Sequence, residues 1–166
     1  MSLFDLTIAA TLGLVLAASC GLRAFLPLFL VSALGAAGML DLAGPVSWMG
    51  TPIAAACFGT AVVAEVMADK IPVVDHAMDA VGLVLRPAAG SVAAISMLDG
   101  ADPLALCVLG LAAGGLVAGK VQVAKAGVRA GSTATTGGLA NPAVSVVEDI
   151  VALGAGGAAA AAAVMI

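Results

Sequence analysis

The chain has few charged and few aromatic side chains. Of its 166 residues, 10% are charged and 3% are aromatic, and tyrosine is absent. A soluble domain has roughly 25% charged residues, because polar side chains cover the surface that stays exposed after folding. Nucleic-acid recognition needs basic patches and aromatic stacking platforms, which this composition does not supply. These shortages exclude an ordinary soluble globule and argue against a nucleic-acid partner.

Paired cysteines and known catalytic signatures are also missing. Cys20, Cys57 and Cys107 stand singly in apolar runs, without a C-x-x-C pair or a neighbouring histidine, so they indicate neither a disulfide framework nor a metal knuckle. We interpret them as small hydrophobic residues. The sequence contains no nucleophile elbow, Walker loop or dinucleotide fingerprint. It therefore assigns no catalytic residue and no organic cofactor, and it favours a protein without enzymatic activity while leaving that question open.

Hydrophobic residues dominate the composition. They make up 63% of the chain, and the mean hydropathy is +1.21. The solvent that suits such a chain is a bilayer, which a helix of ~17–25 apolar residues can cross. We predict an all-α polytopic bundle, a single transmembrane domain over residues 1–166, with about six short or broken helices. The expected crossings lie near residues 6–22, 24–40, 53–68, 80–98, 104–119 and 143–166.

An alternative arrangement has four long spans with re-entrant segments, in which residues 6–40 form one bent helix. The apolar runs are interrupted at Gly21 with Pro27, at residues 86–87 and at residues 141–142. Each interruption leaves backbone groups that must face protein or a water-filled cavity. Small residues at helical spacing, such as the glycines of residues 110–119, allow helices to approach closely.

The charges are distributed unevenly over the loops. With six crossings, the basic residues fall toward one face and the isolated acidic residues toward the other, so the positive-inside rule places the basic loops in the cytoplasm and both termini outside. The basic residues are Arg23, Lys70, Arg86, Lys120, Lys125 and Arg129, and the isolated acidic ones are Asp5, Asp41, Asp99 and Asp102. We expect a basic helix at residues 120–129 and a loop at 131–141. A weak echo between residues 12–24 and 109–130 suggests an internal repeat.

The densest group of acidic residues lies near the middle of the chain. Residues four apart share a helix face, so Glu65 pairs with Asp69, and Asp75 pairs with Asp79 beyond a proline bend. Paired carboxylates repel unless a cation, a shared proton or basic side chains neutralise them. The nearest basic residues are Lys70 and Arg86. The alternative is a solvated charge cluster that only ends a helix.

A second polar group lies in the last third of the chain. Lys125, Arg129 and Thr133 recur every four residues and form one stripe on a helix. The polar residues that follow them are Asn141, Ser145, Glu148 and Asp149. The stripe and these residues together offer charges of both signs to a solute.

Whether Glu148 and Asp149 are buried in the membrane depends on the residue at which the last helix begins. If the helix begins near Val144, both acids lie favourably near its N-terminus. If it begins at Pro142, they lie nearly two turns inside the span, where an unpaired charge costs ~2.5–3.5 kcal/mol on insertion scales. We favour the buried interpretation. The expected basic partners are Arg129, Lys125 or Arg23.

The only histidine, His76, lies between Asp75 and Asp79. A histidine titrates near neutral pH, but we interpret this one as an interfacial polar residue because no second histidine accompanies it. Asp75 and Asp79 are the residues that could hold a divalent cation.

Five stretches of the sequence resemble the hallmark blocks of a known family. The blocks are residues 19–27, 65–75, 86–90, 125–130 and 141–149, and the strings A-D-K-I-P-x-V-D and S-x-x-E-D are the most specific. The family consists of small bacterial integral-membrane proteins and is known as domain-of-unknown-function family 4126. The resemblance covers essentially the whole chain. It implies a multi-pass protein of the bacterial cytoplasmic membrane and supplies no substrate and no catalytic residue.

From these residues we predict a transporter or permease-like protein that moves a small ion or charged solute through a cavity open toward the cytoplasm. The cavity residues are Glu65, Asp69, Lys70, Asp75, Asp79, Arg86, Lys125, Arg129, Asn141, Ser145, Glu148 and Asp149, with Arg23, His76 and Thr133 in a secondary role. Membrane lipids surround the protein, and we expect a homo-oligomer because six short helices enclose little space.

Two other functions fit the same residues. The first is a membrane-embedded enzyme that acts on lipid phosphates, with Mg²⁺ held by Asp75 and Asp79. The second is a scaffold without catalysis, in which the charges only lock helices together.

Overall fold

The computed structural model describes residues 3–42, 44–69, 72–98 and 102–165, apart from the side chains of residues 72, 73, 75 and 76. The described residues form helices, turns and loops and contain no strand, so the all-α prediction is confirmed. The elements are α1 (Leu3–Leu22), α2 (Phe25–Ala36), the 3₁₀ helix η1 (Gly44–Gly50), α3 (Pro52–Ala68), α4 (Pro72–Ile95), α5 (Pro103–Leu109), the π-helical segment η2 (Gly110–Gly115), α6 (Leu116–Thr136) and α7 (Asn141–Ala163).

Four of the described helices are long and apolar enough to cross a bilayer. They are α1, the Ala77–Ile95 part of α4, the continuous helix Pro103–Thr136 and α7. A fifth span results if η1 and α3, which meet at 76°, count as one. Helix α2 has 12 residues, which at 1.5 Å per residue is about 18 Å against the ~30 Å of a hydrocarbon core. Of the six expected crossings, the second is therefore too short to cross by itself.

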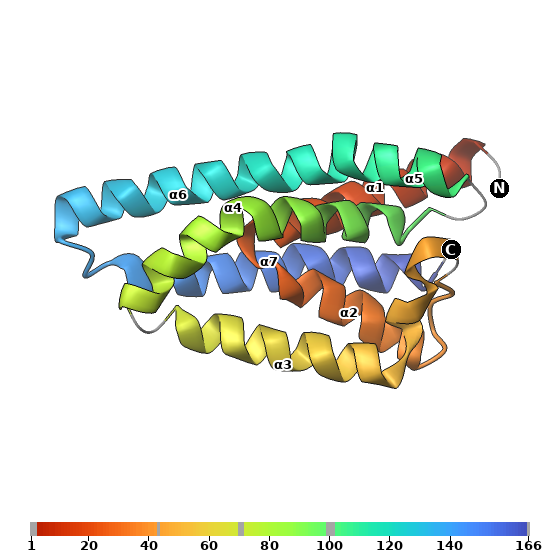
Figure 1. Ribbon diagram of the computed structural model, residues 1–166, viewed down its shortest axis with the longest axis horizontal. Coiled ribbons are helices and arrows are strands. Elements are labelled where there is room, and N and C mark those ends of the chain that lie inside the picture. Colours follow the sequence, from red (N-terminus) through yellow and green to blue (C-terminus); the bar gives the residue numbers. More distant parts are fainter. Residues whose placement is uncertain (1–2, 43, 70–71, 99–101, 166) are drawn as a thin grey trace.

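The helices run alternately in opposite directions between the two ends of the bundle (Figure 1). Helix α1 leads away from the N-terminus and α2 returns, α3 leads away and α4 returns, and the Pro103–Thr136 helix leads away before α7 returns. Both termini therefore lie at the same end, which we call the terminal end. The opposite end, where α6 connects to α7, is called the far end.

The bend between α1 and α2 follows from the sequence. Proline has no N–H, so Pro27 cannot donate to the carbonyl of Arg23 four residues earlier, and a continuous helix is disfavoured there. In the structure α1 ends at Leu22, and Pro27 lies in the first turn of α2, where no intrahelical donor is needed. The predicted interruption at Gly21 with Pro27 is confirmed.

Two other predictions, one of an interruption and one of a loop, differ in the structure. Helix α4 continues through Pro87, so the predicted break at residues 86–87 is wrong; α4 only bends part-way along its length (Figure 1). A helix-interior proline costs about 3 kcal/mol, and in this part of its length α4 packs closely on η2. The predicted loop at residues 131–141 is also too long, because α6 continues to Thr136. Thr135 and Thr136 donate to carbonyls four residues earlier, and Gly137, at φ 63°, ends the helix.

Glycines bring α4 and the η2 segment into close contact. A Cβ atom added to Gly114 would lie 2.4 Å from the carbonyl oxygen of Gly90, and one added to Gly90 would lie 2.9 Å from the carbonyl oxygen of Gly114. Only hydrogen fits between such backbones, as the small-residue spacing predicted. The π-helical geometry of η2 falls at this contact.

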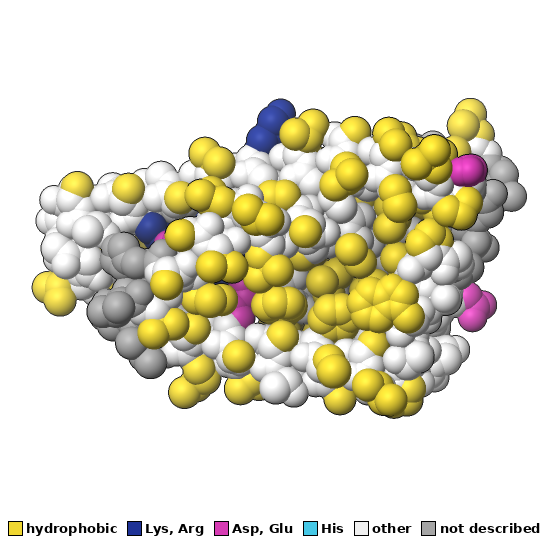
Figure 2. All heavy atoms as spheres, viewed as in Figure 1, with side chains coloured by type: hydrophobic (Ala, Val, Ile, Leu, Met, Phe, Trp, Pro, Cys, Tyr) yellow, Lys and Arg dark blue, Asp and Glu magenta, His cyan; other side chains and the backbone are white. Residues whose placement is uncertain are grey.

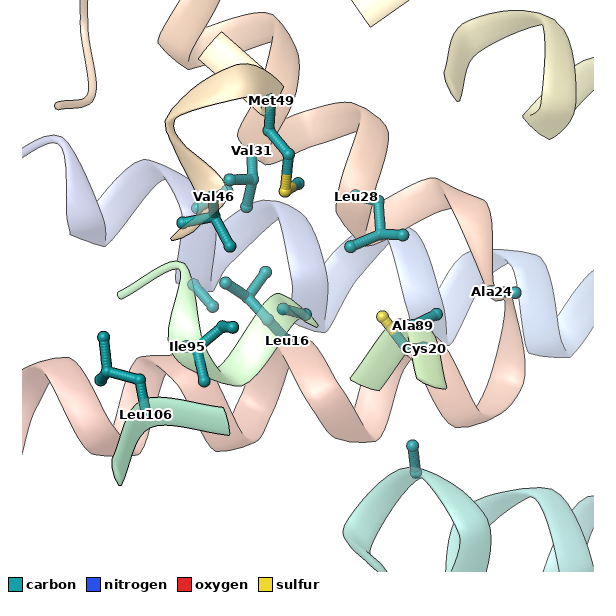
Figure 3. Packing of buried hydrophobic residues seen from close by; sticks show 14 residues of the cluster. Leu16, Cys20, Ala24, Leu28, Val31, Val46, Met49, Ala89, Ile95 and Leu106 are labelled. Atoms are coloured by element: carbon teal, nitrogen blue, oxygen red, sulfur yellow. The ribbon is translucent and has the colours of Figure 1, made fainter. Parts of the chain in front are cut away.

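The apolar core lies on the terminal side of the bundle. Figure 3 shows Leu16 and Cys20 of α1, Leu28 and Val31 of α2, and Met49 of η1 converging from different elements. The outer surface also exposes many large hydrophobic side chains, and Figure 2 shows hydrophobic side chains spread over the whole face with few charged ones among them. A hydrophobic interior with a hydrophobic exterior suits a helix bundle surrounded by lipid.

Candidate functional site

The charged side chains of different helices meet in the half of the bundle nearer the far end. Among the described residues, nine charged side chains form ion pairs with one another there. They are the basic residues Arg23, Arg86, Lys125 and Arg129 and the acidic residues Glu65, Asp69, Asp79, Glu148 and Asp149. We call this set the ionic cluster. It joins the α1–α2 bend, the end of α3, and α4, α6 and α7.

Arg129 connects the carboxylates of three elements. Its guanidinium donates to both oxygens of Glu148, from Nε at 3.1 Å and from Nη2 at 2.8 Å. Nη2 also donates to Asp69 at 3.3 Å, and Nη1 lies 3.6 Å from the carboxylate of Asp79. Two parallel bonds to one carboxylate are the strongest arrangement available to arginine. The sequence stripe that contains Arg129 thus faces inward.

Arg23 connects a second pair of carboxylates. Its Nη1 lies 2.5 Å from Asp69 and its Nε 2.5 Å from Asp149. Its Nη2 donates to the Ser145 hydroxyl at 2.8 Å, and that hydroxyl donates to Asp69 at 3.2 Å. Arg23 is 1% exposed. The sequence analysis placed Arg23 among secondary candidates, whereas the structure puts it at the centre.

The carboxyl of Asp69 lies directly after the end of α3. Burial raises the pKa of Asp69, but the positive charges of Arg23, Lys125 and Arg129 outweigh burial and hold its pKa below the ordinary value. Asp69 is therefore a carboxylate at neutral pH.

Side chains from distant helices cap both sides of the α1–α2 bend. The Lys125 Nζ donates to the carbonyl of Leu22, the last residue of α1, at 3.2 Å, and lies 3.0 Å from Glu148. The Glu65 carboxylate accepts from the amides of Ala24 at 2.9 Å and Phe25 at 3.3 Å. A cation thus meets a helix C-terminus and an anion a helix N-terminus, which is the favourable arrangement for both helix dipoles.

Arg86 and Gln122 complete the cluster from α4 and α6. Arg86 is 2% exposed, and its guanidinium contacts Gln122 through Nη1 and lies 3.9 Å from Glu65 and 3.8 Å from Asp79. The Gln122 amide donates to the backbone carbonyl of Asp79. The sequence analysis passed over Gln122, although it precedes Lys125 and Arg129 by three and seven residues and therefore shares their helix face.

Cavities lined by described residues adjoin the ionic cluster. A cavity of about 440 Å³ at the far end is lined by Asp79, Arg129, Thr133 and Asn141 with three alanines of α6. A second, of about 270 Å³, lies between α2, α3 and α7 and is lined by Arg23, Glu65 and Asp149 among apolar residues. A third, of about 310 Å³, is an apolar space between α1, α6 and α7 with Lys125 and Glu148 in its wall.

The start of α7 decides the interpretation of its two acids. The helix begins at Asn141, so Glu148 lies nearly two turns inside it and is buried, whereas the Asp149 side chain is 29% exposed. Their partners are the three expected basic residues, Arg129 and Lys125 for Glu148 and Arg23 for Asp149. Glu148 is therefore buried, as we favoured from the sequence, whereas the Asp149 side chain is partly exposed.

Several predicted site residues lie apart from these ion pairs. Thr133 accepts a hydrogen bond from the Asn141 amide at 3.1 Å in the wall of the far-end cavity. Lys70 and the side chains of Asp75 and His76 lie outside the described residues. Within the described part of the chain, no group of three or more His, Cys, Asp or Glu residues could hold a metal ion. A divalent cation on Asp75 and Asp79 stays a prediction.

Basic side chains, one of the three expected ways of neutralising the Glu65 and Asp69 carboxylates, face the two residues separately. Glu65 faces the α2 amides and Arg86, while Asp69 faces Arg23 and Arg129. Each carboxylate thus has its own donors, because the end of α3 separates the two side chains.

Apolar helices long enough to cross a bilayer, an apolar outer surface and a buried ionic cluster together define a multi-pass α-helical membrane protein. The family model described as "Domain of unknown function (DUF4126)" matches residues 10–166, and the chain belongs to that family. A comparison with curated proteins found no match, and a comparison with solved structures found none either.

Proposed function

We propose that the protein is a transporter or permease-like protein that moves a small ion or charged solute by way of the ionic cluster. The observation that carries this proposal is the burial of Arg23, Arg86, Arg129 and Glu148 between helices that are apolar elsewhere. A charge inside a bilayer costs about 2.5–3.5 kcal/mol on insertion scales. Well-packed apolar residues stabilise a fold at least as well as buried ion pairs do. Such residues in a membrane helix therefore point to a solute pathway.

The far-end cavity provides access to the cluster. Asp79 and Arg129 lie in its wall, and the ion pairs of Asp79, at 3.6 Å and 3.8 Å, are among the longest in the cluster. A charged solute that reaches this cavity competes for the partners of Asp79 more easily than for the closely bonded Glu148. When Asp79 loses its contact with Arg129, Arg129 can change its contact with Asp69, and Asp69 is also bound by Arg23 at the α1–α2 bend.

The α1–α2 bend supplies the movable element. Discontinuous helices place backbone donors and acceptors at the solute sites of many secondary transporters. Here the bend is held by Lys125 and Glu65, both of which belong to the cluster. A change of partners in the cluster therefore releases the bend. We further propose that the far end faces the cytoplasm of a bacterium and that the protein works as a homo-oligomer.

The test is flux through purified protein in proteoliposomes. Gradients of potassium chloride, sodium chloride, ammonium chloride and potassium acetate are applied in turn, and the translocated charge is recorded. We expect a response to at least one gradient and a loss of at least about tenfold in the double variant Glu148→Gln, Asp149→Asn. The matched control is the double variant Asp5→Asn, Asp41→Asn, which removes two exposed acids at the terminal end and should keep the wild-type flux.

Two outcomes contradict the proposal. One is a wild-type protein that moves charge under none of the gradients. The other is a double variant of α7 that elutes as a single species and carries the same flux as wild type. In that case the cluster only locks helices together, as the scaffold alternative holds.

A further inference from the structure

The N-terminus of α2 is occupied by the carboxylate of another helix. Both oxygens of Glu65 on α3 accept hydrogen bonds from α2 amides, at 2.9 Å from Ala24 and 3.3 Å from Phe25. Ala24 has no side-chain acceptor, so α2 has no cap of its own. The first amides of a helix and its dipole together attract an anion. Glu65, which follows Ala24 by 41 residues in the sequence, therefore occupies an anion site at the start of α2.

Arg86 shows that this site has donors that Glu65 does not use. Its guanidinium is buried, and its Nη2 lies 3.9 Å from Glu65 Oε1, which is an ion-pair distance and too long for a hydrogen bond. Among the described residues, its buried Nε has no hydrogen-bond partner at all. A buried guanidinium normally has its donors satisfied. An anion between the α2 amides and Arg86 would supply what is missing.

The neighbouring cavity gives the Glu65 side chain room to leave. The cavity of about 270 Å³ between α2, α3 and α7 is lined by Glu65 itself and by Arg23, Leu26 and Asp149. A side chain that rotates into this space vacates the α2 amides while its backbone stays in α3. The volume admits a small ion and a few waters.

We propose that the N-terminus of α2 is a binding site for a small monovalent inorganic anion of halide size, and that Glu65 is its internal occupant. The anion enters when the Glu65 carboxylate leaves the α2 amides and rotates into the cavity. This inference rests on the proposed function and names its solute, a halide-sized anion.

The groups that face Glu65 favour this exchange. They are Arg86 on α4, Arg23 at the bend, Cys20 on α1 and Asp149 on α7. The two arginines hold an anion in place of the carboxylate. Asp149 is already paired with Arg23, which limits its repulsion of the incoming ion.

The variant Glu65→Ala tests the site directly. Thermal unfolding of the purified protein in detergent is followed in potassium bromide and in potassium gluconate, at neutral pH and equal ionic strength. We expect Glu65→Ala to unfold at least about 3 °C higher in bromide, with a saturable dependence on bromide, because the halide binds only the folded protein. Wild type should show no such difference, because its own carboxylate occupies the site. Chloride and nitrate should act like bromide, and sulfate should not.

The matched control is Asp149→Ala, which removes a carboxylate from the same cavity but leaves the α2 amides occupied. An equal bromide effect in this control would overturn the proposal, because the ion would then respond to positive charge alone. A Glu65→Ala protein that responds equally to both salts would overturn it too. So would one that folds in neither salt, since bound bromide should replace the missing carboxylate. A variant that folds in bromide and not in gluconate supports the proposal.

The flux assay separates this inference from the proposed function. Bromide stabilisation of Glu65→Ala with no flux in any gradient would keep the anion site and reject transport. Flux that is carried by a cation, with no bromide effect on the variant, would keep transport and reject the anion site.

Discussion

At the scale of single residues, each buried charge has more than one partner. Arg129 holds Glu148 and Asp69, and Arg23 holds Asp69 and Asp149. Removing a charge from water costs several kcal/mol per ion, and only good geometry with further hydrogen bonds repays that cost. Shared partners also mean that one residue cannot change its contacts without affecting the next. Replacing one member of the cluster therefore leaves its partners buried with fewer counter-charges, and the cost of removing them from water is no longer repaid.

Replacing Arg129 should destabilise the fold strongly. Arg129→Ala leaves Glu148 and Asp69 with fewer donors in a buried site, for which we expect a loss of about 3–5 kcal/mol in the free energy of unfolding. Arg129→Lys should lose less, because it keeps the charge but not the two parallel bonds. The measurement is denaturant unfolding in detergent. The control is Lys120→Ala on the same helix, an exposed position that should change the free energy by no more than about 0.5 kcal/mol.

The lowered pKa of Asp69 predicts a loss of stability in acid. A carboxyl whose pKa is lower in the folded than in the unfolded protein contributes stability above its unfolded pKa of about 3.9 and loses it as the pH falls through the folded value. We therefore expect wild type to lose stability below about pH 4. Asp69→Asn, which cannot titrate there, should be less stable at neutral pH and lose less on acidification. Melting temperatures of both proteins between neutral and acid pH check this, and parallel curves would contradict it.

At the scale of elements, glycine and proline set how the helices meet. At Pro27 the helix is interrupted, so that α1 ends and α2 begins, whereas α4 continues through Pro87. The difference lies in the packing: α4 lies against η2 with backbone contacts at Gly90 and Gly114 that hold it as one helix. A helix break thus depends on the neighbours of the proline as well as on the proline.

A side chain at Gly114 should separate α4 from η2. The Cβ of Gly114→Ala would lie 2.4 Å from a backbone oxygen and 2.5 Å from the Cβ of Ala94, so backbones have to move. We expect a loss of about 1–3 kcal/mol, the usual effect of overpacking. Gly154→Ala is the control, because nothing lies within 4 Å of its added Cβ, and it should be neutral or stabilising. Equal thermal stability of the two variants would refute the close contact.

At the scale of the whole molecule, acidic residues mark the terminal end. Asp5 lies in the first turn of α1, Asp41 follows α2, and Asp102 caps α5, and all three element ends lie at the terminal end (Figure 1). The basic residues of the ionic cluster lie toward the opposite end. This distribution, under the positive-inside rule, supports our proposal that the far end faces the cytoplasm.

Cysteine labelling in intact cells tests this orientation. In a background with the native cysteines replaced by alanine, we expect Asp41→Cys to react with a membrane-impermeant maleimide from outside, because it lies at the terminal end. Leu139→Cys, at an 88% exposed position in the far-end loop, should react only after the cells are opened. Both variants are exposed, so each serves as the control for the other. The reverse pattern would invert the orientation.

Part of the site could be predicted from the sequence because charges are rare in this chain. Glu148 and Arg129 lie in largely apolar helices, where few side chains of opposite charge are available to either of them. Their pairing could therefore be expected from the sequence. Arg23 was undervalued and Gln122 was missed, because the sequence does not show that the α1–α2 bend lies against α3, α6 and α7. The interruption at Gly21 with Pro27 indicated that backbone groups there need partners, but the sequence did not show that Glu65 and Lys125 provide them.

The sequence by itself determined that this is an all-helical membrane protein, where α1 gives way to α2, and which residues are too polar to face lipid. Those properties follow from composition and from local backbone chemistry, which act over a few residues. Only the tertiary structure decided that Glu65 caps α2, that α4 runs through Pro87, and that Arg23 and Arg129 share Asp69. These contacts join residues far apart in the chain, so their energies depend on how the helices pack and cannot be read from any one segment.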